Sequence, residues 1–196
     1  MESFILIILV ILPGVQGGDW GVTSGDQCAL RGSSVIIDCQ YDYPSGRWVT
    51  SVGWSRLRQG HFILSKLPLN SAYFNYVGNY RGDCRLRINN VQHDDEGAYL
   101  FNFVTTINRW TSKRAARLSV RELTTVVEPS TVTEGGEVRL SCVSGCSTPV
   151  NILWFRDGQP VPQPGFQATR EDAGRYYCTV QGQDTVRSAP VALNVQ

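Results

Sequence analysis

Six cysteines carry the clearest chemical signal in this chain of 196 residues. An apolar run of nine residues, Phe4 to Leu12, precedes them and is followed by small residues. The run is too short to cross a bilayer and has the pattern of a secretory signal, so we interpret residues 1–17 as a removed signal peptide. Export places the cysteines in an oxidising compartment, where disulfides are the expected state. We expect a secreted chain without membrane contact of its own, or the extracellular part of a longer plasma-membrane receptor.

Other reactive arrangements are scarce. The chain has two histidines, no glycine-rich phosphate loop, no paired-carboxylate constellation and no activated serine or cysteine, so we expect neither an enzyme nor a cofactor. The spacing Cys142-x3-Cys146 has an alternative interpretation as half of a zinc site. His61, His93 and the other cysteines lack the paired spacing that would complete it, so no metal is expected.

Charge is distributed unevenly along the chain. Residues 19–121 hold 13 Lys/Arg and 8 Asp/Glu, whereas residues 122–196 hold 5 and 8. A basic first half suits an anionic partner, although no nucleic acid is expected. Residues 112–117, "SKRAAR", are interpreted as a solvated strand edge, with binding of heparin-like glycans as the alternative. Residues 81–83 form the integrin-recognition tripeptide "RGD", but their position beside Cys84 favours a turn.

Short strands must position all of these residues. Alternating polar and apolar runs recur with turn residues between them, and no long helical period occurs. In the first half the expected strands are "SVIIDCQY", "VGWSRL", "HFILSKL", "CRLRINNV", "AYLFNFV" and "ARLSV". After residue 121 the pattern restarts with "EVRLSCVS", "NILWFRDG", "GRYYCTVQ" and "VALNV". Both halves fit antiparallel sandwiches.

A repeated element links the two halves. Residues 95–101 read D-x-G-x-Y-x-F, and residues 172–178, which lie 77 positions later, read D-x-G-x-Y-x-C. A cysteine and a tryptophan precede each copy: Cys39 and Trp54 in the first half, Cys142 and Trp154 in the second. The arrangement resembles immunoglobulin domains, in which the tryptophan packs in the core and the tyrosine fixes a corner.

The expected fold class is therefore all-β, with two tandem immunoglobulin-like sandwiches. Residues 18–121 form a variable-type domain, because the stretch between its tryptophan and tyrosine has room for extra edge strands. Residues 122–196 form a short constant-type domain of the C2 kind, because only 24 residues separate its tryptophan from its last cysteine. This domain is expected to lack an edge strand. Cys142 and Cys178 occupy its usual disulfide positions, so we expect them to be joined.

The first domain departs from that pattern. Six cysteines allow fifteen pairings, so counting alone does not assign them. Phe101 stands where the second cysteine of the domain would be, which leaves Cys84 as the alternative partner of Cys39, within one sheet. Cys28 and Cys146 remain, and a bridge between them would tie the two domains.

Together these features resemble the sialic-acid-binding immunoglobulin-like lectins, the siglecs. The resemblance rests on "DWGV" at 19–22, on "FNFVTTINRW" at 101–110 and on the cysteine pattern, and it covers residues 20–196. In that family the first-domain disulfide lies within one sheet and another disulfide ties the first two domains. The resemblance thus implies the same two bridges in this chain.

The resemblance also implies a sialic acid site. In siglecs an arginine pairs with the sialic acid carboxylate, and two tryptophans contact the N-acetyl group and the glycerol chain. Trp20 and Trp110 match the two tryptophans, whereas Asn102 stands at the position of the arginine. Asn102 can donate only a neutral hydrogen bond, and Arg109 in the neighbouring loop is the alternative cation.

The function that the resemblance implies is extracellular recognition in cell–cell adhesion and immune regulation, with sialylated glycoconjugates bound through the first domain. Two alternatives stay open. A module of the same fold that has lost sialic acid recognition would bind a protein counter-receptor. A soluble decoy or a truncated receptor fragment would account for the short second domain.

Overall fold

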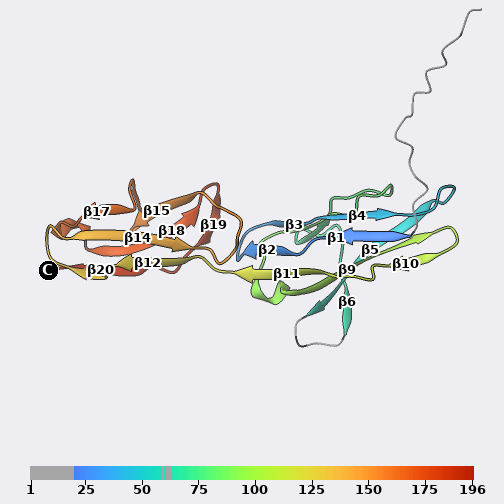
Figure 1. The fold of residues 1–196 in the computed structure, drawn as a ribbon, viewed down its shortest axis with the longest axis horizontal. Coiled ribbons are helices and arrows are strands. Elements are labelled where there is room, and N and C mark those ends of the chain that lie inside the picture. The colour runs from blue at the N-terminus through green and yellow to red at the C-terminus, as the bar shows by residue number, and fades with distance from the viewer. Residues whose placement is uncertain (1–19, 59, 61–62) are drawn as a thin grey trace, which may run out of the picture.

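The computed structural model describes residues 20–58, 60 and 63–196; the expected signal peptide at 1–17 and His61 lie outside these ranges. Figure 1 shows two β-domains arranged end to end, with the carboxyl terminus at the far end of the second. Strand β11 (Ala116–Arg121) closes the first domain and β12 (Thr124–Glu128) opens the second. The linker, residues 122–123, thus runs straight into the first strand of the second domain.

The first domain is a sandwich of two layers. Its larger sheet has the order β2-β11-β9-β5-β6, with β10 also paired to β9, and β2 runs parallel to β11. Besides β11, this sheet contains β2 (Gln27–Leu30), β5 (Val49–Arg58), β6 (Leu64–Lys66), β9 (Gly97–Thr105) and β10 (Arg109–Thr111). The other layer contains the sheet β3-β8-β7 and the pair β1-β4. Its strands are β1 (Gly21–Ser24), β3 (Val35–Ile37), β4 (Cys39–Asp42), β7 (Phe74–Tyr76) and β8 (Leu86–Ile88).

Alternation along β9 builds the core of the first domain. Tyr99, Phe101 and Phe103 point inward and are buried, and the residues between them are more exposed. Trp54 is fully buried on the neighbouring strand, and its Nε1 donates a hydrogen bond to the Cys84 carbonyl oxygen 3.0 Å away. Burial of a side chain of this size contributes roughly 2–3 kcal/mol, so this aromatic cluster is a principal link between the layers.

The second domain is a smaller sandwich. One sheet has the order β12-β14-β17, and the other has the order β13-β20-β18-β15-β16, with β19 paired to β18. Besides β12, its strands are β13 (Thr131–Val132), β14 (Glu137–Val143), β15 (Ile152–Arg156), β16 (Gln159–Val161), β17 (Gly165–Gln167), β18 (Gly174–Val180), β19 (Gln183–Arg187) and β20 (Val191–Val195). The backbone of this domain is described throughout, and no further strand lies between β16 and β17.

The repeated Asp-x-Gly-x-Tyr element forms the same corner in both domains. In the first domain a short 3₁₀ helix, η1 (His93–Asp95), precedes β9, and the Tyr99 hydroxyl donates to the Asp95 carbonyl oxygen at 2.8 Å. Burial raises the pKa of Tyr99 to about 12, so the hydroxyl stays a donor at neutral pH. The Asp95 carboxylate pairs with buried Arg56 at 2.6 Å. The second domain repeats these contacts after η2 (Arg170–Asp172), with Tyr176, Asp172 and Arg156.

The strands differ from the sequence-based expectation in two respects: one expected run is divided, and several short strands, of which β19 is an example, form outside the expected runs. The run "SVIIDCQY" is divided at Asp38, because β3 pairs with β8 whereas β4 pairs with β1. Strand β19 lies in a polar segment whose alternation did not mark it as a strand, and it forms through pairing with β18. Both differences arise from the choice of neighbouring strand, which local alternation does not specify.

Candidate functional site

Trp20 and Trp110 lie together on the inner side of the first domain. Their ring centroids are 6.1 Å apart in a stacked arrangement, and Trp20 also stacks on Phe103 at 5.9 Å. Trp110 stands directly opposite Phe103 in the β9–β10 ladder, so both side chains leave the same face of the sheet. The two tryptophans, both partly buried, therefore extend the aromatic core.

Asn102 and Arg109 lie on the opposite, outer face of the same sheet. Asn102 is flanked by Gly53 on β5 and Thr111 on β10, and Arg109 stands opposite Val104. A Cβ atom on Gly53 would lie 2.8 Å from the Asn102 Oδ1, so the amide group lies across the glycine. Strand alternation thus divides the four residues of the expected sialic acid site between two faces, with the tryptophans inside and the two polar residues outside.

Three disulfides join the cysteines in the pairs expected from the sequence. They are Cys28–Cys146, Cys39–Cys84 and Cys142–Cys178. All six cysteines are paired in this way, so the two layers of the first domain have no disulfide between them. Phe101 occupies the space instead, with its ring centroid 5.5 Å from that of Trp54 and 5.1 Å from that of Tyr41. An aromatic contact thus replaces the missing covalent link.

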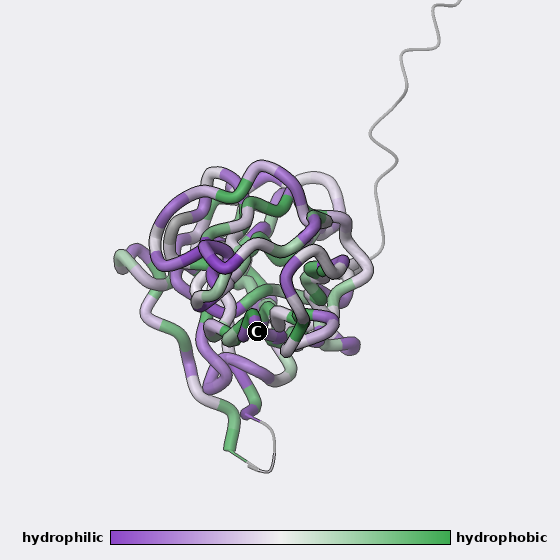
Figure 2. The backbone as a smooth tube through the Cα atoms, turned by 90° about the vertical axis from the view of Figure 1, so that its left-hand side faces the viewer, coloured by the Kyte–Doolittle hydropathy of each residue, from purple (hydrophilic) through white to green (hydrophobic). Residues whose placement is uncertain are grey.

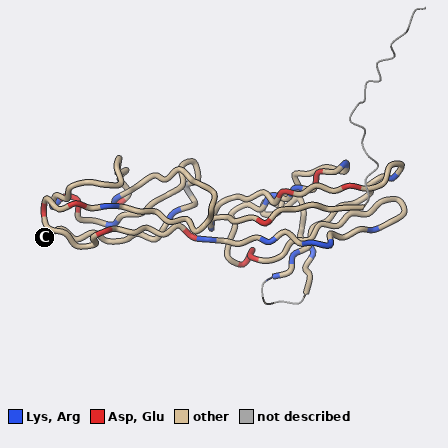
Figure 3. Tube along the Cα trace, viewed as in Figure 1, with Lys and Arg blue, Asp and Glu red and all other residues tan. Residues whose placement is uncertain are grey.

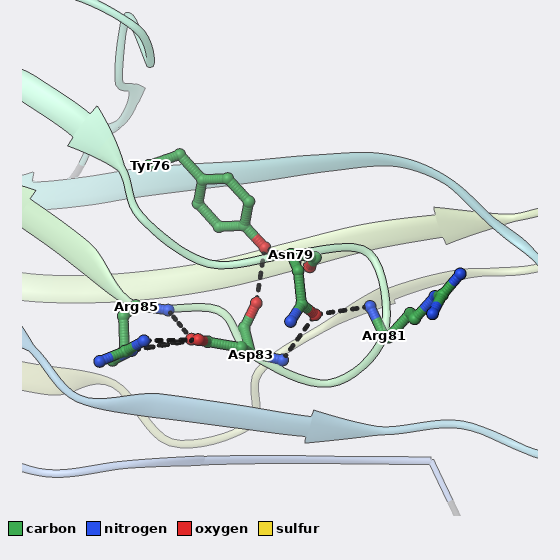
Figure 4. Close-up of polar contacts among 5 residues, drawn as sticks. All are labelled: Tyr76, Asn79, Arg81, Asp83 and Arg85. Carbon is green, nitrogen blue, oxygen red and sulfur yellow. Dashed lines mark hydrogen bonds and ion pairs between the residues drawn. The ribbon is translucent and has the colours of Figure 1, made fainter.

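Residues 81–83, the "RGD" tripeptide, form a closed loop (Figure 4). The Asn79 Oδ1 accepts hydrogen bonds from two backbone N–H groups of the tripeptide at 2.7 and 3.2 Å, and the Tyr76 hydroxyl donates to the Asp83 carbonyl oxygen at 2.8 Å. The Asp83 carboxylate pairs with Arg85 at 2.8 Å, and the hydrogen bond from this guanidinium lowers the pKa of Asp83. The carboxylate that an integrin would need is therefore already engaged, and the segment serves as a turn.

Large apolar side chains are exposed at the end of the first domain that lies away from the second. Trp48, between β4 and β5, is 75% exposed, and Ile107, between β9 and β10, is 63% exposed. The Thr106 N–H donates to the Trp48 carbonyl oxygen at 3.1 Å, so the two loops are joined. Trp48 and Ile107 are called the apolar tip below.

The hairpin between β5 and β6 is a second exposed apolar element. Ile63 and Leu64 are 78% and 47% exposed. Figure 2 shows the hairpin standing away from the rest of the tube, with hydrophobic residues next to its grey segment. The hairpin begins after the last residue of β5. Trp48 of the apolar tip directly precedes the first residue of β5, so the hairpin and the tip lie at opposite ends of this strand.

The sequence pattern alone did not reveal the apolar tip. Trp48 lies between the expected strands "SVIIDCQY" and "VGWSRL", directly after a turn that contains Pro, Ser and Gly. The available signal was the tryptophan itself, because a large aromatic residue beside a Pro-Ser-Gly turn has no core position to fill. Ile107, in "TTIN", gave the same signal in a weaker form.

The junction between the domains is held by contacts on several sides. The Thr185 hydroxyl donates to the Gly32 carbonyl oxygen at 2.8 Å, in addition to the interdomain disulfide. Glu122, in the linker, accepts a hydrogen bond from Arg31 at 2.9 Å, and the His93 Nε2 lies 3.0 Å from the same carboxylate oxygen. A cleft of about 670 Å³ opens beside these contacts, between the β2–β3 turn, the linker and strands β18 and β19.

The described ranges of the chain contain neither a metal-binding cluster nor a helix that could span a membrane. No group of three His, Cys, Asp or Glu residues there is arranged to hold a metal ion. Within the same ranges, no helix has the length and apolar character needed to cross a bilayer.

Comparison with known proteins identifies relatives at the level of sequence. Residues 122–195 match the family model of the immunoglobulin domain. Cell adhesion molecule 4 of Xenopus laevis is 24% identical over 187 residues, which cover 91% of this chain and 45% of that protein. The chain therefore spans less than half the length of this relative.

Solved structures of two other proteins are similar to this chain at low sequence identity. Murine CRIg is 19% identical, with a TM-score of 0.46, and the match covers 54% of this chain and 100% of that chain. The N-terminal four Ig domains of Dscam1 isoform 1.9 are 20% identical, with a TM-score of 0.40, over 88% of this chain and 43% of that chain. The strand topology and the family match over residues 122–195 confirm the predicted fold class, an all-β chain of two tandem immunoglobulin-like sandwiches.

Proposed function

We propose that this chain is an extracellular recognition module whose first domain binds a protein counter-receptor in cell–cell adhesion. The apolar tip carries the proposal, because Trp48 and Ile107 are both exposed on two loops that a backbone hydrogen bond joins. Tryptophan is enriched among the residues that dominate protein–protein binding energies. Exposed apolar clusters of this kind mark interaction sites.

The outer face of the larger sheet continues from the apolar tip. Ser51, Gly53, Asn102 and Val104 face outward from β5 and β9 between the tip and the β5–β6 hairpin. These four residues are small or neutral, so they add no charge that a partner would have to compensate, and Arg109 opposite Val104 places a cation beside them. The face therefore suits a protein surface with apolar anchors at its two ends.

Sequence relationship and cysteine chemistry support the same proposal. Cell adhesion molecule 4 is, by its name, an adhesion protein, and it is similar along most of this chain. Three disulfides favour a location outside the cell, either secreted or on the outer side of the plasma membrane, because such bonds persist in oxidising compartments.

Sialylated glycans are the second candidate ligand, and the siglec-like sequence at residues 101–110 favours them. Asn102 supplies no positive charge for the sialic acid carboxylate, however, and the strong charge-assisted hydrogen bonds are lost with it. Trp20 and Trp110 face the inner side of the sheet, away from Asn102. A protein counter-receptor therefore ranks above a sialoside.

A cell-binding assay with the mature chain in multimeric form tests the proposal. Trp48→Ala with Ile107→Ala should lower binding by about 30-fold or more, because truncating a hot-spot residue costs 2 kcal/mol or more. Both side chains are exposed, so the thermal unfolding temperature should stay that of the parent. Val143→Ala with Leu153→Ala removes two exposed apolar side chains from the second domain and should leave cell binding unchanged.

Sialidase treatment of the cells separates the two candidate ligands. Under the counter-receptor proposal, the treatment leaves binding of the parent intact. Binding that disappears after sialidase treatment but is insensitive to the Trp48→Ala, Ile107→Ala change would refute the proposal in favour of the sialoside.

A further inference from the structure

A line of cations runs along one edge of the first domain. Arg109 lies on β10, Lys113 and Arg114 lie in the connection to β11, and Arg117 lies on β11. All four are exposed. Figure 3 shows blue segments following one another along β10 and β11. These four residues are called the basic strip below.

We propose that the basic strip binds a linear sulfated polysaccharide. The strip spans nine residues, so its first and last Cα atoms are at most about 26 Å apart in extended backbone. Such a line can contact several successive anionic groups of one chain. Arginine guanidinium groups match oxyanions of this type with two parallel hydrogen bonds.

The positive charges of the basic strip are not neutralised by ion pairs with the described residues. None of its four cations takes part in an ion pair with the described residues. The nearby Asp26 carboxylate accepts a hydrogen bond from the backbone N–H of Arg117 at 2.9 Å and forms no ion pair with its guanidinium. Further along β11, Arg121 does pair with Glu96 at 3.3 Å, so the uncompensated line ends before it. Uncompensated charges of one sign raise the local concentration of an oppositely charged ligand.

The connection that carries Lys113 and Arg114 is anchored to the core. The Ser112 N–H donates to the Phe101 carbonyl oxygen at 2.8 Å, and the Ser112 hydroxyl accepts from the Phe101 N–H at 3.1 Å. The Lys113 Nζ lies 5.3 Å from the centroid of the Trp110 ring, which orients it further. A preorganised strip loses less conformational freedom when a ligand binds.

The chemistry of the strip favours a sulfated polysaccharide over other anions. A single carboxylate would engage one or two of the four cations and leave the rest unused. Three disulfides favour an extracellular location, where nucleic acid is not the expected polyanion. The strip is also distinct from the residues of the apolar tip, so this inference stands apart from the proposed counter-receptor.

Heparin affinity chromatography and a titration against salt test the proposal on the mature chain. The strip variant is Lys113→Gln, Arg114→Gln and Arg117→Gln. The matched control, Arg87→Gln, Arg139→Gln and Arg187→Gln, removes the same charge from exposed residues on β8, β14 and β19. The strip variant should elute at lower salt, and its slope of log K against log salt should fall by about 2, by analogy with charge neutralisation on single-stranded polyphosphates. The control should keep the slope of the parent.

Four further measurements decide the outcome, together with the comparison of the strip and control variants. The Trp48→Ala, Ile107→Ala variant should bind heparin as the parent does, and the strip variant should still bind heparinase-treated cells. An equal loss of heparin binding in the strip and control variants would overturn the proposal, because net charge alone would then explain the binding. Equal affinity for desulfated heparin, or tighter binding of a DNA duplex of similar length, would overturn it as well.

Discussion

The side chain at position 102 determines how strongly the outer face of the larger sheet can bind a carboxylate. An arginine at this position would supply two parallel charge-assisted hydrogen bonds, worth roughly 1.5–3 kcal/mol. Asn102→Arg should therefore raise the affinity for a free sialoside by about ten- to a hundredfold over the parent in an NMR titration. Adding Trp110→Ala should leave that gain in place, because the Trp110 side chain leaves the other face of the sheet.

Asn102→Gln is the matched neutral control for this prediction. It lengthens the side chain without adding charge, and we expect no gain in sialoside affinity from it. Loss of the Asn102→Arg gain on addition of Trp110→Ala would contradict the arrangement described above. The indole would then have to reach the same site as the new guanidinium.

Residue identities were sufficient to nominate the four candidate sialic acid residues but not to place them. Asn102 and Trp110 are on different strands, and the register between strands depends on the connecting loop. In that loop the Thr105 hydroxyl accepts a hydrogen bond from the Asn108 N–H at 3.1 Å, and Trp110 is set opposite Phe103. Nothing in the polar stretch "TTIN" indicated this register.

At the scale of elements, the corner that precedes β18 makes the stability of the second domain depend on pH. Burial opposes ionisation of Asp172, but hydrogen bonds from the Thr169 N–H and hydroxyl and the charge of Arg156 outweigh it, so its pKa lies below the usual range. A carboxylate whose pKa is lowered on folding contributes stability above its unfolded pKa of about 4. That contribution is lost as the pH falls through the lower folded value.

Asp172→Asn should therefore lower the free energy of unfolding at pH 7 by about 1–3 kcal/mol, the contribution of hydrogen bonds to a charged group. The difference from the parent should shrink as the pH falls from 5 to 2, because the parent carboxylate becomes neutral in that range. Thermal unfolding at a series of pH values measures this. Glu171→Gln, in the same short helix but at an exposed position, should follow the parent curve. A difference that stays constant over this pH range would show that the charge of Asp172 is not what stabilises the corner.

The elements themselves were predictable where a repeated motif or a strict alternation marked them. The two Asp-x-Gly-x-Tyr copies located the strands β9 and β18 and both corners. The division of "SVIIDCQY" at Asp38 was not predictable, because both parts alternate correctly and only their different partners separate them. The Cys39–Cys84 bridge could be predicted from the sequence, because Phe101 stands where the usual disulfide partner of Cys39 would be.

At the scale of the whole molecule, the two domains share packing as well as a covalent link. Leu30, at the end of β2 in the first domain, is buried in the hydrophobic cluster of the second, next to Leu123. Gly32 has φ +85°, and a Cβ atom there would lie 2.8 Å from the Thr185 backbone oxygen. The interdomain disulfide was expected because Cys28 and Cys146 remain after the other two pairs and because the siglec resemblance implies it, but this close approach needed the three-dimensional structure.

The last prediction separates the disulfide from the packing at the junction. In a background with Cys28→Ser and Cys146→Ser, the contacts of Gly32 and Leu30 should still hold the mean orientation of the domains. Gly32→Ala in that background should widen the distribution of interdomain angles in small-angle X-ray scattering, because the new Cβ displaces the Thr185 backbone. Gly135→Ala is the matched control, since Gly135 has the same φ of +85° but no atom within 4 Å of the added Cβ. If Gly32→Ala and Gly135→Ala give the same scattering curve, backbone strain alone accounts for the change, and the Gly32–Thr185 contact does not orient the domains.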